Sequence, residues 1–106
     1  MATPRILSRD EAIRIVRDYK QAIAPRFNNQ LKVMLYGSYA KGSPHAWSDI
    51  DVAVIVPKIS NDQWLAQSAE LVHESHQMNS LIEPVLMEDN EDSILYSDVM
   101  RTGIAV

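Results

Sequence analysis

The chain has 106 residues, of which 46% are hydrophobic and 23% charged, and its formal net charge at pH 7 is -4. This length predicts one domain spanning residues 1–106 and excludes a two-domain enzyme, while the composition is typical of a globular protein rather than a disordered one. The acidic balance argues against non-specific binding to nucleic acid, which usually requires a basic surface.

The chain contains no cysteine. Disulfides, thiolate metal sites and cysteine nucleophiles are therefore excluded, and the composition suits a reducing compartment. The N-terminal residues lead into a charged segment, and no stretch approaches the roughly 18 apolar residues that a membrane span needs. We expect a cytoplasmic protein that does not bind a membrane.

The first predicted elements are a helix over residues 9–24 and a strand over residues 31–36. Ser8 and Glu11 fit a capping box at the start of the helix, and Pro25 ends it. Apolar residues recur within it at helical spacing: Ala12, Ile13, Val16, Tyr19 and Ile23. The strand is short, apolar and rich in strand-forming residues.

Residues 37–44 have the glycine, serine and proline content of a turn, with room for one helical turn. Residues 49–56 predict a second strand, which Pro57 ends. Because both faces of its later half are apolar, we expect a central strand that is covered on two sides.

Ser60 or Asn61 is placed to cap a helix that runs to about Met78. A third strand is predicted over residues 81–87. Its Pro84 has no N–H to donate to a neighbouring strand, which indicates an edge strand or a bulge.

Residues 92–101 predict the last helix, with Gly103 near its C-cap. The element order is then helix, strand, strand, helix, strand, helix. This order predicts an α/β (α+β) fold with a small mixed sheet of three or more strands and helices packed on it.

Two of the three glycines flank one short loop, although a chain of this length would usually contain about seven. Gly37 allows a ligand to approach the backbone closely, Ser38 adds a hydroxyl next to free amides, and Lys41 adds a positive charge. These features are typical of phosphate binding. A tight turn with a solvated lysine remains an equally simple interpretation of Gly37 to Gly42.

Asp49 and Asp51 lie two residues apart at the start of the buried strand, so their side chains should share one face. Two like charges at a partly buried strand end are unfavourable unless a cation neutralises them, and carboxylate oxygens suit Mg²⁺. The alternative is that Asp49 caps a turn and Asp51 is solvated.

Glu83 is the third candidate, because it is a carboxylate within an apolar run. If its strand lies next to the second strand, the three carboxylates could share one face and hold two metal ions for phosphoryl or nucleotidyl transfer. The alternative is an edge-strand glutamate that faces water beside Pro84.

Gly37-Ser38, ten further residues and Asp49-Ile50-Asp51 resemble the Gly-Ser-x10-Asp-x-Asp signature of the DNA polymerase β-like nucleotidyltransferase superfamily. The chain is most similar to its minimal members, the minimal nucleotidyltransferase (MNT) antitoxins that accompany small helical HEPN ribonuclease toxins. Only residues 36–56 form a sharp motif. The chain has Lys41 where many relatives have arginine, and Glu83 where aspartate is commoner.

The resemblance implies that Gly37 and Ser38 hold the β- and γ-phosphates of a nucleoside triphosphate, with Lys41 beside them. It implies that Asp49 and Asp51 bind two Mg²⁺ ions and that Glu83 is the third acidic residue at the metal.

Members of this superfamily attack the α-phosphate with a hydroxyl and release pyrophosphate. The MNT resemblance implies transfer of AMP from ATP to a tyrosine of a HEPN toxin. Two alternatives remain: a nucleotidyltransferase for a small hydroxylated molecule such as an aminoglycoside, and a non-catalytic module that binds the toxin.

Other conspicuous residues have simpler interpretations. His73 and His76 do not have zinc-site spacing and are expected at the surface or half-buried. We expect Trp64 to be a core or partly buried packing residue. Trp47 and His45 either pack within their loop or contact the nucleotide base or the acceptor.

Overall fold

The computed structural model describes residues 6–46 and 48–106 and contains a four-stranded sheet with the strand order β3-β2-β1-β4. The strands are β1 (Lys32–Tyr36), β2 (Ile50–Val56), β3 (Ile82–Glu88) and β4 (Ile104–Ala105). β1 is antiparallel to both β2 and β4, whereas β2 and β3 are parallel. The mixed sheet is therefore confirmed. The two-residue β4 was not predicted, because so short a segment leaves no alternating pattern.

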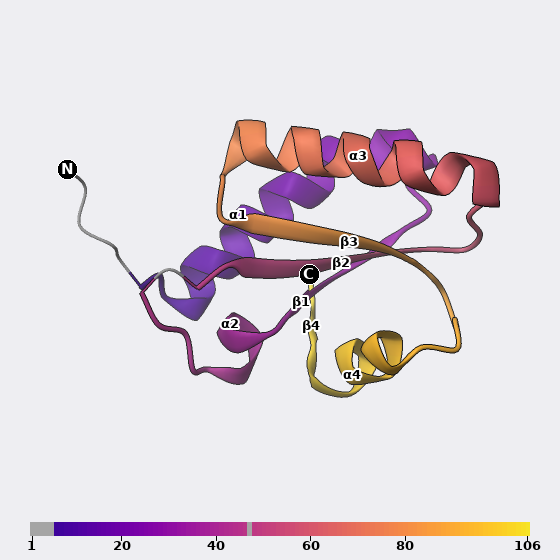
Figure 1. Ribbon diagram of the computed structural model, residues 1–106. Helices are drawn as coiled ribbons and strands as arrows, with labels where there is room; N and C mark the ends of the chain where they lie inside the picture. The colour runs from indigo at the N-terminus through magenta and orange to yellow at the C-terminus, as the bar shows by residue number, and fades with distance from the viewer. Residues whose placement is uncertain (1–5, 47) are drawn as a thin grey trace.

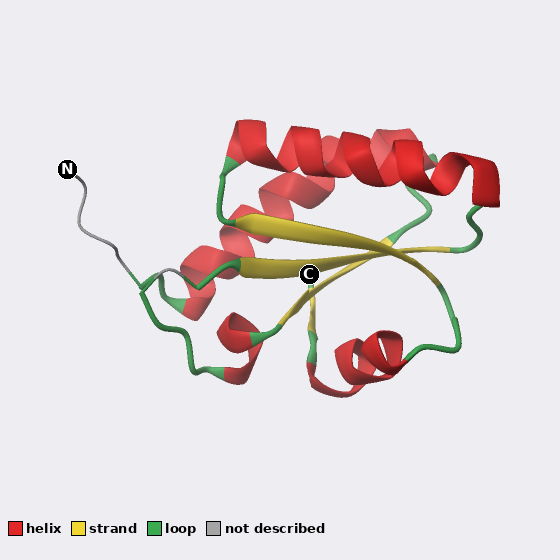
Figure 2. Cartoon of the chain, in the orientation of Figure 1, coloured by secondary structure: helices red, strands yellow, loops and turns green. Residues whose placement is uncertain are grey.

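The helices are α1 (Arg9–Ile23), α2 (Ser38–Lys41), α3 (Asn61–Met78) and α4 (Ile94–Thr102). Figure 1 shows α1 and α3 on one side of the sheet and α4 on the opposite side, while α2 follows the end of β1. Figure 2 shows that the parallel strands β2 and β3 are joined by the α3 crossover. No helix within residues 6–46 and 48–106 is long and apolar enough to cross a membrane.

The start of α1 is confirmed in detail. The Ser8 hydroxyl accepts from the Glu11 N–H at 3.0 Å, and Glu11 Oε1 accepts from the Ser8 N–H at 3.1 Å. The helix ends at Ile23, one residue earlier than expected. A 3-10 helix, η1 (Ala24–Phe27), follows it and contains Pro25 in its first turn, where no N–H is needed.

Side chains of β2 alternate between two hydrophobic clusters. Toward α1 and α3 the strand presents Ile50, Val52, Val54 and Val56, and toward α4 it presents Ala53 and Ile55. The prediction of a central strand covered on both sides is confirmed. By the same alternation Asp51, the second residue of β2, lies on the same face as Ala53 and Ile55.

β3 is an edge strand, as Pro84 predicted. The prediction for Trp64 was wrong, because this side chain is 47% exposed. Residues 61–66 of α3 are all exposed, whereas the buried Leu71 and Ser75 come later in the helix. Helical spacing identified apolar positions, but not how much of the helix lies against the sheet.

The last helix begins at Ile94, two residues later than expected. The Ser93 hydroxyl accepts from the Tyr96 N–H at 3.1 Å and caps the helix there. The Tyr96 hydroxyl donates to Asp89 at 2.8 Å, and Lys32 pairs with the same carboxylate at 3.3 Å. These contacts attach α4 to the ends of β1 and β3.

Tyr19 connects α1 to α3 through a buried hydrogen bond from its hydroxyl to the Leu71 carbonyl at 2.8 Å. We predict that Tyr19→Phe lowers the free energy of unfolding by about 1 kcal/mol, because one buried hydrogen bond is lost while the ring remains. Urea denaturation measures this difference. An unchanged midpoint would show that the bond contributes nothing to the packing of the two helices.

Candidate functional site

The turn after β1 has the predicted helical character. Gly37 has φ 75° and ψ -153°, a conformation in which side chains are strained, and α2 begins at Ser38. The Lys41 N–H donates to the Gly37 carbonyl at 3.0 Å, and the Ser43 N–H donates to the Ser38 carbonyl at 3.0 Å. Gly42 ends the helix with φ 77°. The turn therefore presents Ser38 and the backbone around Gly37 at the end of the sheet.

The glycine at position 37 is required for a second reason. A Cβ at this position would collide with the Asp51 carboxylate and lie 3.0 Å from its Cγ. The turn and the Asp51 side chain are therefore in close approach. The structure brings together the two halves of the motif that the sequence separates.

Asp51 lies in a row with residues of both neighbouring strands. The register pairs it with Tyr36 of β1 and with Glu83 of β3. Asp49 lies two residues earlier in the chain, in the loop that leads into β2. Reciprocal bonds fix this loop, since the His45 N–H donates to the Ser48 hydroxyl at 2.8 Å and the Ser48 N–H donates to the His45 carbonyl at 2.9 Å.

The negative charges in this row are not balanced by nearby positive side chains of the described residues. Burial, followed by repulsion from Asp49 and then Glu83, raises the pKa of Asp51 above its ordinary value. Burial, Asp51 and Glu83 raise the pKa of Tyr36 to about 12. Within residues 6–46 and 48–106, no lysine or arginine forms an ion pair with any of the three carboxylates.

The carboxylates do not converge into a closed metal cage. Asp49 and Glu83 are exposed and Asp51 is half-buried. In the described part of the chain, no three acidic or histidine side chains are grouped closely enough to hold a metal ion. Mg²⁺ commonly takes only one or two protein carboxylates and completes its coordination with water and substrate phosphate oxygens. The hard oxygen donors and unbalanced charge around Asp51 fit such a shared ion.

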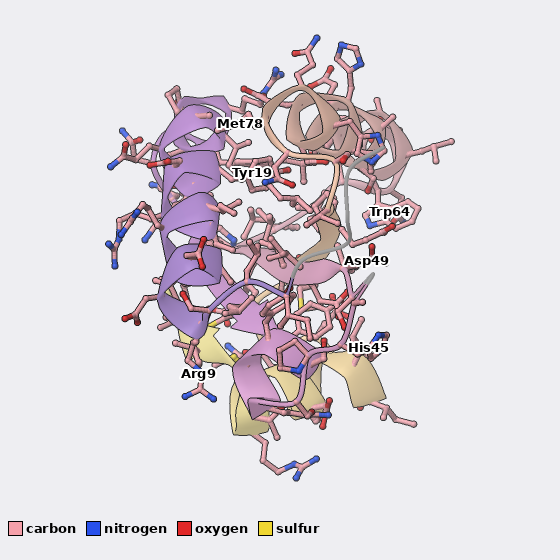
Figure 3. The ribbon with its side chains drawn as sticks, turned by 90° about the vertical axis from the view of Figure 1, so that its left-hand side faces the viewer. Arg9, Tyr19, His45, Asp49, Trp64 and Met78 are labelled. Carbon is pink, nitrogen blue, oxygen red and sulfur yellow. The ribbon has the colours of Figure 1, made fainter. Side chains whose placement is uncertain are left out.

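The other predicted residues lie on α2 and in the loop between α2 and β2. Lys41 and His45 are exposed, and His45 Nδ1 lies 2.8 Å from the Ala46 carbonyl oxygen. Figure 3 shows His45 in the loop after α2 and Asp49 further along the same segment. Trp47 lies outside the described residues.

The two histidines of α3 take no part in the site. His73 and His76 are exposed, as expected, and the His73 ring lies 3.2 Å from the Gln77 amide.

Sequence reasoning missed two residues. Tyr36 immediately precedes Gly37, so the alternation of β1 was a signal for its place beside Asp51. Arg9 donates hydrogen bonds to the backbone of α2, and no local pattern indicates a contact between residues about 30 positions apart.

The mixed sheet, with its Gly37-Ser38 turn against Asp51 at the start of β2, is consistent with the class of nucleotidyltransferases. The chain belongs to the family described as polymerase beta, nucleotidyltransferase, whose pattern matches residues 21–106. The match includes the turn, both aspartates and Glu83.

Individual proteins agree with this assignment. The chain is 28% identical over 100 residues to a candidate protein adenylyltransferase of Methanocaldococcus jannaschii, covering 91% of this chain and 99% of the relative. A crystal structure of a candidate nucleotidyltransferase from Sulfolobus solfataricus has a TM-score of 0.65 at 18% identity, covering 98% of this chain and 90% of that one.

A further similar structure is that of a toxin–antitoxin with AMP-PNP. Its TM-score is 0.52 at 25% identity, and the match covers 93% of this chain and 72% of that one. A mutant of the MntA–HpeT toxin–antitoxin has a TM-score of 0.50 at 22% identity, with 93% and 72% covered.

Gly37→Ala tests the close approach between the turn and Asp51. We predict a loss of about 3 kcal/mol in the free energy of unfolding, because backbone strain is combined with displacement of the carboxylate. Gly42→Ala is the matched control: it also has a positive φ, but its Cβ would meet only the flexible end of Arg9, at 3.1 Å. It should cost about 1 kcal/mol. If urea denaturation shows that both variants lose the same free energy of unfolding, the predicted collision with Asp51 is wrong.

Asp51→Asn tests the repulsion. Since the folded-state pKa of Asp51 lies above the ordinary 3.8, its ionised form destabilises the fold above that pKa. The penalty fades as the pH falls through the folded-state pKa, and it is gone well below pH 3.8, where the carboxyl is protonated in both states. Without divalent ions, we predict a higher Tm for Asp51→Asn at pH 7 and a shrinking difference at lower pH. A lower Tm at pH 7 would contradict this electrostatic argument.

Proposed function

We propose that this protein transfers AMP from ATP to a tyrosine hydroxyl of a cognate HEPN toxin and so acts as an antitoxin. The observation that carries the proposal is the approach of the Gly37 turn to Asp51, in a row with Glu83. In the reaction, the tyrosine oxygen bonds to the α-phosphorus, the bond from that phosphorus to the bridging oxygen breaks, and pyrophosphate leaves. The phenol proton passes to solvent.

Residues of the turn bind the triphosphate in this proposal. Ser38 and the backbone at Gly37 contact the β- and γ-phosphates, where a side chain at position 37 would block the approach. Lys41 is exposed one helical turn away and adds a positive charge to the same region. The phosphates are thereby placed next to the acidic row.

In this proposal Asp49, Asp51 and Glu83 would hold Mg²⁺, two ions in the full complex with the triphosphate. Bound Mg²⁺ neutralises phosphate charge and favours ionisation of the attacking hydroxyl. The repulsion of Asp51 by Asp49 and Glu83 favours binding of a cation at this row. An acidic protein can in this way bind an anionic nucleotide.

The comparisons support this choice of substrate. The name of the Methanocaldococcus jannaschii relative describes adenylyl transfer to a protein. The toxin–antitoxin structure contains AMP-PNP, an analogue of ATP. A small hydroxylated acceptor such as an aminoglycoside has no structural observation in its favour.

One observation favours a second candidate, a non-catalytic module that inhibits a toxin by covering it. Glu83 is exposed on an edge strand, and the described acidic side chains do not form a three-ligand group. Such a module would retain the Gly37 turn that binds the triphosphate but would not transfer AMP.

Intact-mass spectrometry separates the two candidates. The partner protein is incubated with this protein, ATP and Mg²⁺, with Asp51→Asn as the inactive variant. We predict addition of AMP to the partner, and a loss of about 100-fold or more in the Asp51→Asn reaction, because this carboxylate would hold the Mg²⁺ that neutralises the phosphate charge. Glu83→Gln should reduce the rate as well.

Tandem mass spectrometry of the product then identifies the modified residue. AMP on a residue other than tyrosine would overturn the acceptor assignment alone. A stable complex of the two proteins without any change in mass would overturn the transfer reaction and favour the covering module.

A further inference from the structure

The first residue of α1 contacts the carboxyl end of α2. Arg9 Nη2 donates to the Ala40 carbonyl at 3.0 Å, and Arg9 Nε lies 3.5 Å from the Tyr39 carbonyl. Figure 3 shows Arg9 at the end of α1, where the N-terminal turn of that helix meets the segment that carries the motif. One guanidinium therefore joins two segments that the sequence places 30 residues apart.

α2 needs such a contact. It has only four residues, and one helical turn is not stable by itself, because ordering it costs more than its few internal hydrogen bonds return. Its internal bonds use the Gly37 and Ser38 carbonyls, so the Tyr39 and Ala40 carbonyls need other partners. A cation at a helix C-terminus also interacts favourably with the backbone dipoles.

A second contact strengthens the same connection. The Leu7 N–H donates to the Tyr39 hydroxyl at 3.2 Å in a buried position. The Tyr39 ring is buried in the cluster beneath α1. The residues before and at the start of α1 thus hold both the ring and the backbone of α2.

No other cation takes this role within the described residues. Lys41 belongs to α2 itself, but its ammonium is exposed and forms no hydrogen bond there. Arg9 is the only basic side chain of residues 6–46 and 48–106 that donates to the α2 backbone.

We infer that Arg9 is a positioning residue for the triphosphate: it fixes α2 so that Ser38 and the backbone at Gly37 meet the β- and γ-phosphates in one orientation. The inference rests on the proposed function for the role of the turn. Arg9 acts through α2 and is not placed in contact with the nucleotide. It therefore sets affinity for phosphates without taking part in the reaction.

Calorimetric titration with ATP and with AMP tests this role in the full-length protein. Arg9→Ala should weaken ATP binding about tenfold, since a hydrogen bond from a charged group is worth roughly that factor. AMP, which lacks the β- and γ-phosphates, should bind with unchanged affinity. Arg9→Lys should recover part of the ATP affinity, because an ammonium can still donate to one carbonyl.

Arg14→Ala is the matched control, because Arg14 is an exposed arginine on the same helix without a hydrogen bond or ion pair in the described structure. It removes the same charge and should leave ATP affinity unchanged. Amide exchange measured by NMR supplies an independent readout. Lys41 and Ser43, whose N–H groups close the turn, should exchange faster in Arg9→Ala than in Arg14→Ala.

The outcomes distinguish a failure of the role of Arg9 from a failure of the proposed function. If the wild type binds ATP and Arg9→Ala binds it equally well, the inference is wrong and the proposed function stands. An equal loss of ATP and AMP affinity would reduce Arg9 to a structural role. A wild type without affinity for any nucleotide would overturn the proposed function and the role of Arg9 with it, whereas the exchange rates would still report whether Arg9 holds the turn.

Discussion

The contact between the Gly37 turn and the Asp51 carboxylate is the constraint on which the site depends. It requires a residue without a side chain at the end of β1, in a conformation that favours glycine, and an acidic side chain on the adjacent antiparallel strand. Burial of this carboxylate, with repulsion from Asp49 and Glu83, raises the pKa of Asp51, so its ionised form costs free energy in the fold. The hydrophobic strands supply the stability that tolerates this cost, since β2 is buried on both faces beyond its first residues.

The two faces of the sheet differ in the kinds of side chain that they present. The face under α1 and α3 contains the larger hydrophobic cluster, whereas the α4 face combines a smaller cluster with the row of Tyr36, Asp51 and Glu83. Glu83 is exposed and Asp51 is half-buried, so this part of the α4 face is accessible to a ligand. The inner face of α1 packs on the strands, and the first residue of this helix donates to the backbone of α2.

Much of the fold could be predicted from the sequence because its signals are local. The capping box of Ser8 and Glu11, the apolar run of β2 and the edge position of Pro84 each depend on neighbouring residues. The contact of Arg9 with α2, the exposure of Trp64 and the two-residue β4 depend on how distant segments meet, which spacing does not report. For the site, the sequence indicated that the Gly37 turn and Asp51 belong together, but not that the three carboxylates stop short of a closed cage in the described part of the chain.

Asp51 and Glu83 are neighbours in the sheet, but the chain between them is a crossover that includes the 18 residues of α3. Hydrogen bonds between β2 and β3 set the register of these strands. The register therefore does not depend on the number of residues in the connection. Longer or shorter connections would deliver the same glutamate to the same aspartate as long as β3 begins at the same point of the sheet. The third acidic residue of such chains is therefore located by its offset from the start of its strand, and its separation along the chain from the Asp-x-Asp pair is free to drift during evolution.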